Sequence, residues 1–347
     1  MNNDWKNYLL QNNAKQDDNG LFVFNQPYSD NQGDDKDDII CDLSYFSTIV
    51  IAGGDATEFI QGQFTNDVNK VDESNSQISG FCNNKGRMIA NYRLFQHQQN
   101  YFISIRNDLV ERSIQHLKNY ILRSEVAIQD ISEQLIHIGV SGENAAALLG
   151  SYIDNLNTNI DSVSSNENYI AIRVAGDTPR YEIFCSFEHA TKLWQELEEK
   201  TNIVNTAYWN YLNIKNGLPF IDGNTSEQFV PQMANMELIN GISFEKGCYT
   251  GQEIVARTHF LGKQKRRTYR ISIMSEIEPK AGDQLATDTS TENQYTGTLV
   301  TLHPTSENNY EALAVIQIKS AEEDKLQLKE SAAKISVLDL PYSLTAE

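Results

Sequence analysis

The pattern of hydrophobic residues changes near residue 265, and this change constrains the fold more than any other feature of the chain. From residue 266 onwards, short apolar segments such as RRTYRISIMSEI, YTGTLVTLH and YEALAVIQI alternate with turn residues and show almost no helical periodicity. Such spacing is typical of a small β-barrel or β-sandwich. We therefore predict a separate C-terminal β-barrel domain over residues 266–347.

The residues before this boundary combine strand hairpins with helices. Two strand-like runs flank the polar turn NNKG in SQISGFCNNKGRMIANYRLFQ, and a second hairpin is predicted across YIAIRVAGDTPRYEIFCSF. Helical segments such as DLVERSIQHLKNYIL and EHATKLWQELEEKT accompany these strands. We predict the α+β class, with two mixed α+β domains and largely antiparallel sheets over residues 39–265, the second domain centred on 126–200.

Residues 1–38 differ from the rest in composition. They include the acidic run SDNQGDDKDD, which is poor in apolar residues, and the short segment LFVF, which can dock on the core. A segment with little apolar surface cannot offset the entropy lost on ordering. We expect residues 1–38 to form an acidic, loosely ordered N-terminal segment.

Charge and apolar runs limit the partners of the chain. The formal net charge of -19 disfavours a broad nucleic-acid surface, because phosphate backbones require clustered Lys and Arg. One basic stretch, GKQKRRTYR, leaves a local tRNA contact open, although a solvated strand edge explains it more simply. No run approaches eighteen apolar residues and the N-terminus lacks the pattern of a secretory signal, so we expect no membrane partner.

Several common types of site lack sequence support. The chain contains neither GxxxxGK[ST] nor GxGxxG nor GxSxG, which are typical of P-loop, dinucleotide and serine-hydrolase sites. Its histidines are isolated, so we expect no metal site. The four cysteines contain no CxxC pair, which indicates free thiols in a reducing compartment and a cytoplasmic location.

One cysteine stands in an unusual local sequence, KGCYTGQEIVAR, over residues 246–257. The spacing of Thr250 and Glu253 predicts a capping box that opens a short helix, with Cys248 two residues before the cap. The positive end of that helix and the nearby Lys246 would both favour the thiolate form of Cys248. A lone cysteine is usually a small buried hydrophobic residue, and Glu253 is better explained as a cap than as a catalytic base. The local sequence leaves both interpretations of the cysteine open.

Three stretches of the chain resemble one protein family. The segment FVPQMANMELINGISFEKGCYTGQEIVAR is similar to the signature of the YgfZ family, folate-binding proteins related to the T protein of the glycine cleavage system. FIQGQFTNDV and CNNKGRMIANYRLF resemble two further recurring stretches of that family, in the same order and at similar spacing. The resemblance covers residues from about 40 to 270, and the KGCYTGQE element is its most specific part.

The resemblance implies a fold and a function. The implied fold has three domains around a central cavity, two of them α+β and the last a C-terminal β-barrel. Members are similar in binding a reduced folate, such as tetrahydrofolate, in that cavity. They are implicated in maintaining iron–sulfur enzymes, including those that thiolate tRNA, which makes such enzymes the implied protein partners. The family's cysteine falls on Cys248, and Lys246 precedes it as a second candidate catalytic residue.

Two aromatic residues are the implied contacts of the folate rings. Flat pterin and benzoyl rings are held by stacking, which contributes about 1–3 kcal/mol for a nucleic-acid base. By the landmarks of the family, these contacts fall on Phe46 and Trp209. A tryptophan is common in relatives at the first position, so Phe46 keeps the stacking face but lacks an indole N–H donor. Without the resemblance, Trp209 would be assigned to the packing of a helix against the core.

Polar residues are expected at the edges of the folate. Asp67, Gln252 and Glu253 are candidates for the amide and amino groups of the pterin, although a cap or turn role explains each of them nearly as well. Lys85 and Arg87 could bind the carboxylates of the glutamate tail through charge-assisted hydrogen bonds. As residues of a hairpin turn they would need no ligand at all.

Three functions follow from the resemblance, and whether the protein is an enzyme stays open among them. The first is a folate-dependent accessory factor for iron–sulfur enzymes, in which Cys248 meets a sulfur, cluster or disulfide of its partner. The second is an aminomethyltransferase like the glycine-cleavage protein, which the presence of Cys248 disfavours. The third is a non-catalytic folate sensor or scaffold for tRNA modification, supported only by the basic stretch from Lys263 to Arg270. We rank the accessory factor first, the sensor or scaffold second and the aminomethyltransferase last.

Overall fold

The computed structural model describes residues 1–17, 20–24, 36–287, 295–322, 326–329 and 333–344. The chain divides into two compact units. The first unit comprises Met1–Phe59, Asn69–Gln77 and Arg93–Trp209, and the second comprises Ile60–Val68, Ile78–Tyr92 and Asn210–Glu347. Each unit is therefore assembled from separate stretches of the chain, which differs from the contiguous division expected from the sequence.

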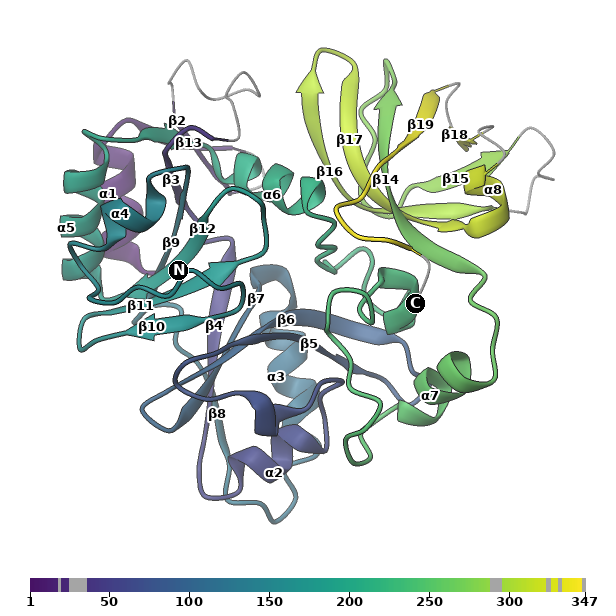
Figure 1. The fold of residues 1–347 in the computed structure, drawn as a ribbon, viewed down its shortest axis with the longest axis horizontal. Helices are drawn as coiled ribbons and strands as arrows, with labels where there is room; N and C mark the ends of the chain where they lie inside the picture. The colour runs from purple at the N-terminus through teal and green to yellow at the C-terminus, as the bar shows by residue number, and fades with distance from the viewer. Residues whose placement is uncertain (18–19, 25–35, 288–294, 323–325, 330–332, 345–347) are drawn as a thin grey trace. The chain divides into compact units, whose positions relative to one another are not determined.

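A six-stranded sheet forms the centre of one part of the first unit (Figure 1). Its order is β10-β11-β12-β9-β3-β13, and all neighbours are antiparallel except β3 and β13. The strands are β3 Ile39–Asp42, β9 Ile136–Ser141, β10 Val163–Ser165, β11 Tyr169–Val174, β12 Arg180–Cys185 and β13 Asn202–Val204. Helices α1 (Asn3–Gln11), α4 (Ala145–Leu149) and α5 (Phe187–Leu197) share a core with β9 and β12 and cover one face of the sheet (Figure 1).

The N-terminal residues are more ordered than the sequence indicates. The Asn2 side chain caps α1 by accepting a hydrogen bond from the amide of Trp5 at 2.9 Å, and both Trp5 and Leu9 are fully buried. β1 (Ala14–Gln16) pairs with β2 (Phe22–Phe24), whose two phenylalanines enter the same core. The expectation of loose order was therefore wrong for α1, because an amphipathic helix of polar composition still buries two large side chains. Most of the acidic run SDNQGDDKDD lies outside the described residues.

A five-stranded sheet has the order β5-β6-β7-β4-β8. Its strands are β4 Phe46–Ala52, β5 Gln77–Cys82, β6 Met88–His97, β7 Asn100–Arg106 and β8 Ala127–Asp130. β5 and β6 are joined by the NNKG turn, as the sequence predicted. Helices α2 (Ala56–Gln61) and α3 (Val110–Lys118) and the 3-10 turns η1 (Val68–Lys70) and η2 (Asn107–Leu109) connect these strands. The boundary between the two units passes through β5 and β6.

The C-terminal sheet belongs to the second unit and is almost closed. Its order is β18-β15-β16-β17-β14-β19, all antiparallel, and the terminal strands β18 and β19 also lie against each other. The strands are β14 Arg266–Met274, β15 Gln284–Thr287, β16 Gly297–Ser306, β17 Asn309–Gln317, β18 Leu326–Leu328 and β19 Lys334–Leu338, with helix α8 at Ile318–Glu322. Inward side chains of these strands, such as Ile271, Leu299 and Ala314, form its core. Curling of the sheet buries this core without a covering layer of helices.

The stretch of chain that follows β13 and precedes β14 contains α6 (Thr206–Lys215), η3 (Pro231–Ala234) and α7 (Gln252–Phe260). The predicted α+β class, with largely antiparallel sheets and a C-terminal barrel-like sheet, is confirmed. The central cavity stays a prediction. Among the described residues, no helix combines the length and apolar character needed to cross a membrane.

Candidate functional site

Trp209 lies in the first unit, on α6, and is fully buried. The guanidinium of Arg180 on β12 lies 4.5 Å from the centre of the indole ring, which is a cation–π distance. The ring also presses against the backbone of β9, because a Cβ atom built on Gly139 would lie only 2.7 Å from it. Glycine at 139 therefore makes room for the indole. Trp209 does pack its helix against the core, which is the role that the sequence without the resemblance would assign to it.

Phe46 is the first residue of β4 and is buried in the same unit. Its ring lies 4.2 Å from that of Tyr45 and 5.8 Å from that of His137, measured between ring centres. His137 in turn stacks on Phe184 at 4.1 Å. The imidazole Nε2 of His137 lies 3.5 Å from a carboxylate oxygen of Glu182.

Charged side chains surround these rings in the interior of the first unit. Burial disfavours the ionised form of Glu182, but His137, Arg93 and Arg180 outweigh burial and lower the pKa of the Glu182 carboxyl. Burial lowers the pKa of Arg180 to about 10, and Glu182 opposes that change. An arginine with this pKa remains a cation at neutral pH. The six residues that share these contacts are called the aromatic-polar cluster below: Tyr45, Phe46, His137, Arg180, Glu182 and Trp209.

Several polar atoms of the aromatic-polar cluster have no hydrogen-bond partner among the described residues. They include the indole Nε1 of Trp209, the phenol oxygen of Tyr45 and the Nδ1 of His137. A buried polar atom left unpaired costs about 1–3 kcal/mol, so such atoms usually meet a ligand or a water. Donors and acceptors beside flat aromatic rings suit a planar heteroaromatic molecule that carries amide and amino groups.

Four members of the aromatic-polar cluster were not identified from the sequence: Tyr45, His137, Arg180 and Glu182. A signal was present in PRYEIFC, where Arg180 and Glu182 stand two residues apart in an otherwise apolar strand. Residues at i and i+2 of a strand point to the same face, so both charges had to lie in one buried place. The contribution of His137 depends on pairing between β9 and β12, in which it lies opposite Phe184.

The second unit contains the cysteine segment, in which Lys246 is buried. Its ammonium donates hydrogen bonds to the backbone carbonyls of Gln61 at 2.7 Å, Phe64 at 2.5 Å and Asn66 at 3.1 Å. Burial lowers the pKa of Lys246 to about 8, and the nearby Asp67 opposes this shift. Since an ammonium has three donors, these carbonyls use all of them. Lys246 thus ties the KGCYTGQE stretch to the FIQGQFTNDV stretch, and a direct effect on Cys248 stays a prediction.

The predicted capping box at Thr250 and Glu253 is wrong. The cap of α7 is Gly251, in a left-handed conformation with φ of 83°, and no side chain caps the helix. Thr250 instead donates a hydrogen bond to the side chain of Gln63 at 3.1 Å. Cys248 therefore lies three residues before the cap rather than two. Two features require glycine at 251. Its φ is positive, and a Cβ there would lie only 2.5 Å from the carbonyl oxygen of Asn83.

The NNKG turn packs against the start of α7. A Cβ on Gly86 would lie 2.8 Å from the Cβ of Ile254, and the backbone oxygen of Gly251 is also close to Gly86. The second unit therefore brings the three recurring stretches together. From the stretch that contains KGCYTGQE, Lys246 contacts FIQGQFTNDV, and Gly251 and Ile254 contact the NNKG turn of CNNKGRMIANYRLF. None of this was visible from their positions in the sequence, which are up to 185 residues apart.

Cys248 is exposed, whereas the other three cysteines of the chain are buried. Burial raises the pKa of Cys82 and of Cys185 to about 12, and it raises that of Cys41 as well. These three thiols are therefore neutral and covered at physiological pH. Cys248 therefore lies at the surface rather than in the core, and its reaction with a partner stays a prediction.

The other predicted site residues also lie in the second unit. Asp67 is partly buried and accepts a hydrogen bond from Gln61 at 2.8 Å. Gln252 begins α7 and is partly buried, while Glu253 is exposed. Lys85 and Arg87 are exposed on the NNKG turn, where Arg87 donates to the carbonyl of Gln228. Their contact with a folate stays a prediction.

The basic stretch from Lys263 to Arg270 is divided by the structure. Arg267 is buried and pairs with Glu237 at 2.8 Å, and Arg270 pairs with Glu311 at 2.6 Å. Only Lys263 and Lys265 of this stretch are fully solvent-exposed. Two of the five cations are thus already neutralised, which reduces the support for direct tRNA contact.

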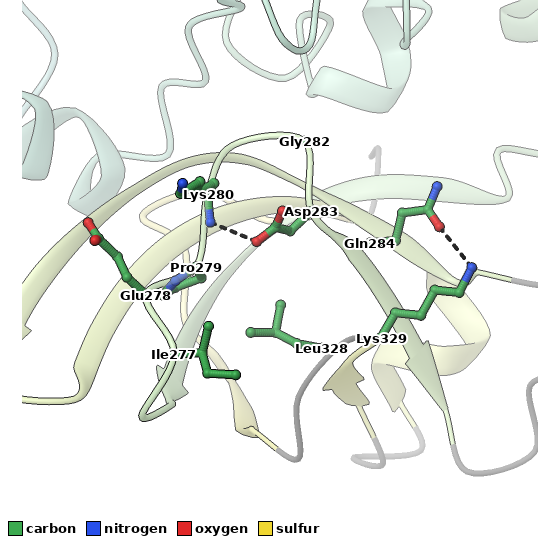
Figure 2. Close-up of a pocket in the computed structure, with 9 residues that line it drawn as sticks. All are labelled: Ile277, Glu278, Pro279, Lys280, Gly282, Asp283, Gln284, Leu328 and Lys329. Carbon is green, nitrogen blue, oxygen red and sulfur yellow. Dashed lines mark hydrogen bonds between the residues drawn. The ribbon is translucent and has the colours of Figure 1, made fainter. Parts of the chain in front are cut away.

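A pocket of about 590 Å³ is found on the C-terminal sheet (Figure 2). Its wall includes Ile277, Leu328, Lys280 and Lys329, and Figure 2 shows Lys329 directed at Gln284. None of the predicted site residues lines this pocket. Among the described residues, no group of three or more His, Cys, Asp or Glu side chains is arranged to hold a metal ion.

Comparison with known proteins places the chain in a family. Residues 36–242 match the family model described as the GCVT N-terminal domain. The tRNA-modifying protein YgfZ of Pectobacterium carotovorum subsp. carotovorum (strain PC1) is 31% identical over 304 residues, covering 87% of this chain and 91% of that protein. The chain belongs to the YgfZ family. The resemblance noted from the three sequence stretches is thereby confirmed.

Other comparisons agree with membership of the YgfZ family. The tRNA-modifying protein YgfZ of Yersinia pseudotuberculosis serotype O:3 (strain YPIII) is 29% identical over 306 residues, covering 88% of this chain and 92% of that protein. Among solved structures, glycine cleavage system aminomethyltransferase T from Bartonella henselae matches with a TM-score of 0.68 at 15% identity, covering 88% of this chain and 86% of that one. This YgfZ-family chain therefore shares the fold of that aminomethyltransferase.

Proposed function

We propose that this chain binds a reduced folate and supports the maintenance of iron–sulfur enzymes that modify tRNA, with Cys248 as its reactive thiol. The observation that carries the proposal is the exposure of Cys248 in a segment whose backbone is held in place by Lys246 and Gly251. The relatives named tRNA-modifying protein YgfZ supply the biological setting. The buried state of the other cysteines leaves Cys248 as the thiol available to a partner.

The aromatic-polar cluster supports the folate part of the proposal. Phe46 and Trp209 would contact the flat rings, as the family resemblance implies. The unpaired Nε1 of Trp209 is available to donate a hydrogen bond, and the ionised Glu182 accepts hydrogen bonds from amino and amide N–H groups. When bound, a reduced folate supplies a carrier of one-carbon units. The residues of the aromatic-polar cluster would orient it and shield its rings from water.

The cysteine segment supports the sulfur part of the proposal. A thiolate is the form that attacks a disulfide or ligates iron, and it must be accessible to a second protein. The tripod of carbonyls around Lys246 fixes the chain two residues before Cys248, so the thiol is presented from a defined backbone. Such presentation lowers the entropy lost when a partner docks.

Replacing Cys248 tests the proposed function. In cells that lack their own copy of the gene, we expect Cys248→Ser to lose most of the tRNA thiolation that the wild-type chain restores, because serine cannot act as a soft nucleophile or iron ligand. Tetrahydrofolate binding, followed by tryptophan emission, should be unchanged in Cys248→Ser and strongly altered in Trp209→Phe. Wild-type thiolation by the serine variant would exclude Cys248 as the reactive group.

A further inference from the structure

The outer face of α7 exposes large apolar side chains next to the cysteine segment. Ile254 is 37% exposed, Phe260 is 66% exposed and Leu261, directly after the helix, is 84% exposed. Residues 254, 257 and 261 recur at helical spacing, so Ile254, Arg257 and Leu261 share one face of α7. The opposite side of the helix is anchored by the buried Val255, whose carbonyl accepts a hydrogen bond from Gln232 at 2.6 Å. The exposed apolar face is therefore held rigidly towards solvent.

Aromatic contacts also fix one of these side chains. Phe260 lies edge-on to His259 at 4.8 Å and to Phe244 at 6.0 Å between ring centres. Phe244 and His259 stack on each other at 3.7 Å. An aromatic ring that is exposed yet already ordered loses little entropy on binding, which is typical of the residues that dominate protein interfaces.

Exposed basic side chains lie near the apolar residues in the turn that packs on Ile254 and along the chain at α7 and after it. The NNKG turn contributes Lys85 and Arg87 next to Ile254, since Gly86 packs directly on that residue. The other exposed cations follow along the chain: Arg257, Lys263 and Lys265. Among the residues that the structure describes, Lys85, Arg257, Lys263 and Lys265 form no ion pair. The exposed acidic residues of the region are Glu245 and Glu253.

This surface differs in sign from the rest of the molecule. The chain as a whole has a net charge of -19, yet this surface exposes the cations Lys85, Arg87, Arg257, Lys263 and Lys265 beside only two exposed acidic residues, Glu245 and Glu253. Unpaired cations kept together on a strongly acidic protein attract an acidic partner to this face and repel it elsewhere. Exposed apolar side chains rimmed by charge are typical of a protein interface.

We propose that the α7 surface, formed by Lys85, Arg87, Ile254, Arg257, Phe260, Leu261, Lys263 and Lys265, docks an acidic protein whose interface combines acidic with apolar side chains. The proposal deepens the proposed function and rests on it in one respect, because it describes the protein that the thiol of Cys248 would meet. A protein fits better than an RNA for two reasons. The surface exposes the large apolar side chains of Ile254, Phe260 and Leu261, and the net charge of the chain repels a long polyanion.

Charge reversal on the α7 surface tests the proposal in cells lacking their own copy of the gene. The double variant Arg257→Glu with Leu261→Asp should lower thiolated tRNA on the order of tenfold, since hot-spot residues control most of an interface's affinity. The conservative variant Arg257→Lys should keep most of the activity. The matched control is Ile277→Asp with Lys329→Glu, at an exposed isoleucine and lysine of the pocket in Figure 2, which changes the net charge equally and should retain activity. Thermal unfolding and tetrahydrofolate binding should be alike in both double variants.

Photocrosslinking identifies the class of occupant directly. A photoreactive phenylalanine derivative in place of Leu261 should give an adduct that resists ribonuclease, is destroyed by protease and has an acidic isoelectric point. The adduct should disappear when Arg257→Glu is added and should not form from position 277. An adduct that ribonuclease destroys, or low-salt binding of purified tRNA that Arg257→Glu with Leu261→Asp abolishes, would make the occupant an RNA and overturn the proposal.

The outcomes separate this inference from the proposed function. Full activity of the α7 double variant together with loss of activity in Cys248→Ser would overturn the docking surface and leave the function standing. Full activity of Cys248→Ser together with an acidic, ribonuclease-resistant adduct at position 261 would support the docking surface and overturn the role of the thiol. Absence of any adduct at position 261 in active cells would overturn the docking surface.

Discussion

Lys246 shows how a residue beside a reactive cysteine can act through the backbone. Its ammonium is buried and directs all three donors to the carbonyls of Gln61, Phe64 and Asn66. The local sequence indicated instead a cation that favours the thiolate of Cys248. The carbonyl contacts make Lys246 a positioning residue for the segment that carries the thiol.

Removing the ammonium should therefore destabilise the fold. We expect Lys246→Met to lower the free energy of unfolding by about 1–3 kcal/mol, because three carbonyls, two of them in buried hydrogen bonds, lose their donor. Urea titration monitored by circular dichroism measures the effect. Lys85→Met, at an exposed position with no ion pair among the described residues, is the control and should change stability by less than about 0.5 kcal/mol. Equal stability of the two variants would contradict the positioning role.

Gly139 is the second residue whose effect can be predicted from contacts. A methyl group there would lie 2.7 Å from the indole of Trp209, which is closer than a carbon–carbon contact allows. Gly139→Ala should therefore shift Trp209, alter tryptophan emission and cost about 1–3 kcal/mol of stability. Gly54→Ala is the control, because its Cβ would meet only a flexible glutamate side chain at 3.5 Å. An unshifted emission spectrum in Gly139→Ala would argue against this packing.

At the scale of single elements, β16 of the C-terminal sheet carries a buried histidine. His303 is stacked on Tyr211 at 5.1 Å, and burial lowers the pKa of the imidazole to about 4. Between pH 6.5 and pH 4 the unfolded chain binds a proton at this residue that the folded chain does not bind. The free energy of unfolding must therefore decrease as the pH falls through this range.

Replacement of the imidazole should remove this pH dependence. We expect the wild type to lose on the order of 1–3 kcal/mol more stability than His303→Phe when the pH falls from 7 to 4.5. The phenyl ring keeps the contact with Tyr211 but cannot bind a proton. Urea titrations of both proteins at the two pH values make the comparison, in which the carboxyl groups of the chain contribute equally. Parallel losses in the two proteins would show that His303 does not resist protonation.

At the scale of the whole molecule, the dominant electrostatic property is the excess of acidic residues. The net charge of -19 places like charges over much of the surface, and their repulsion destabilises the folded chain. The α7 surface is an exception because its cations lie together. This contrast is the reason why we expect an acidic partner to bind at that surface. Salt screens both the general repulsion and the specific attraction of an acidic partner.

Screening should make the protein more stable as salt is added at neutral pH. We expect the melting temperature at pH 7.5 to rise by about 2–5 °C between 20 mM and 300 mM NaCl, because the Debye length falls below the spacing of surface charges. Near pH 5, close to the sequence isoelectric point of about 4.7, the increase should largely vanish. Differential scanning fluorimetry at both pH values gives the answer. A salt effect of equal size at the two pH values would point to a cause other than net charge.

Much of the fold could be predicted from the sequence because hydrophobic periodicity is a local property. The NNKG turn between two apolar runs gave the β5–β6 hairpin, and the strand pattern after residue 265 gave the C-terminal sheet. The order of α1 was missed because its buried residues, Trp5 and Leu9, are few within a polar segment. They are stabilised by distant partners, such as Asp42, which accepts a hydrogen bond from the Trp5 indole at 2.8 Å.

The family and the identity of Cys248 as the residue of interest followed from the sequence alone, since a motif is a linear string of residues. Whether that thiol is exposed, which glycine caps α7 and where Lys246 directs its donors were decided only by the tertiary structure. The aromatic-polar cluster and the α7 surface were likewise decided only by the tertiary structure. Each brings together side chains from segments far apart in the chain, and the burial and contacts that determine their chemistry exist only after those segments have packed.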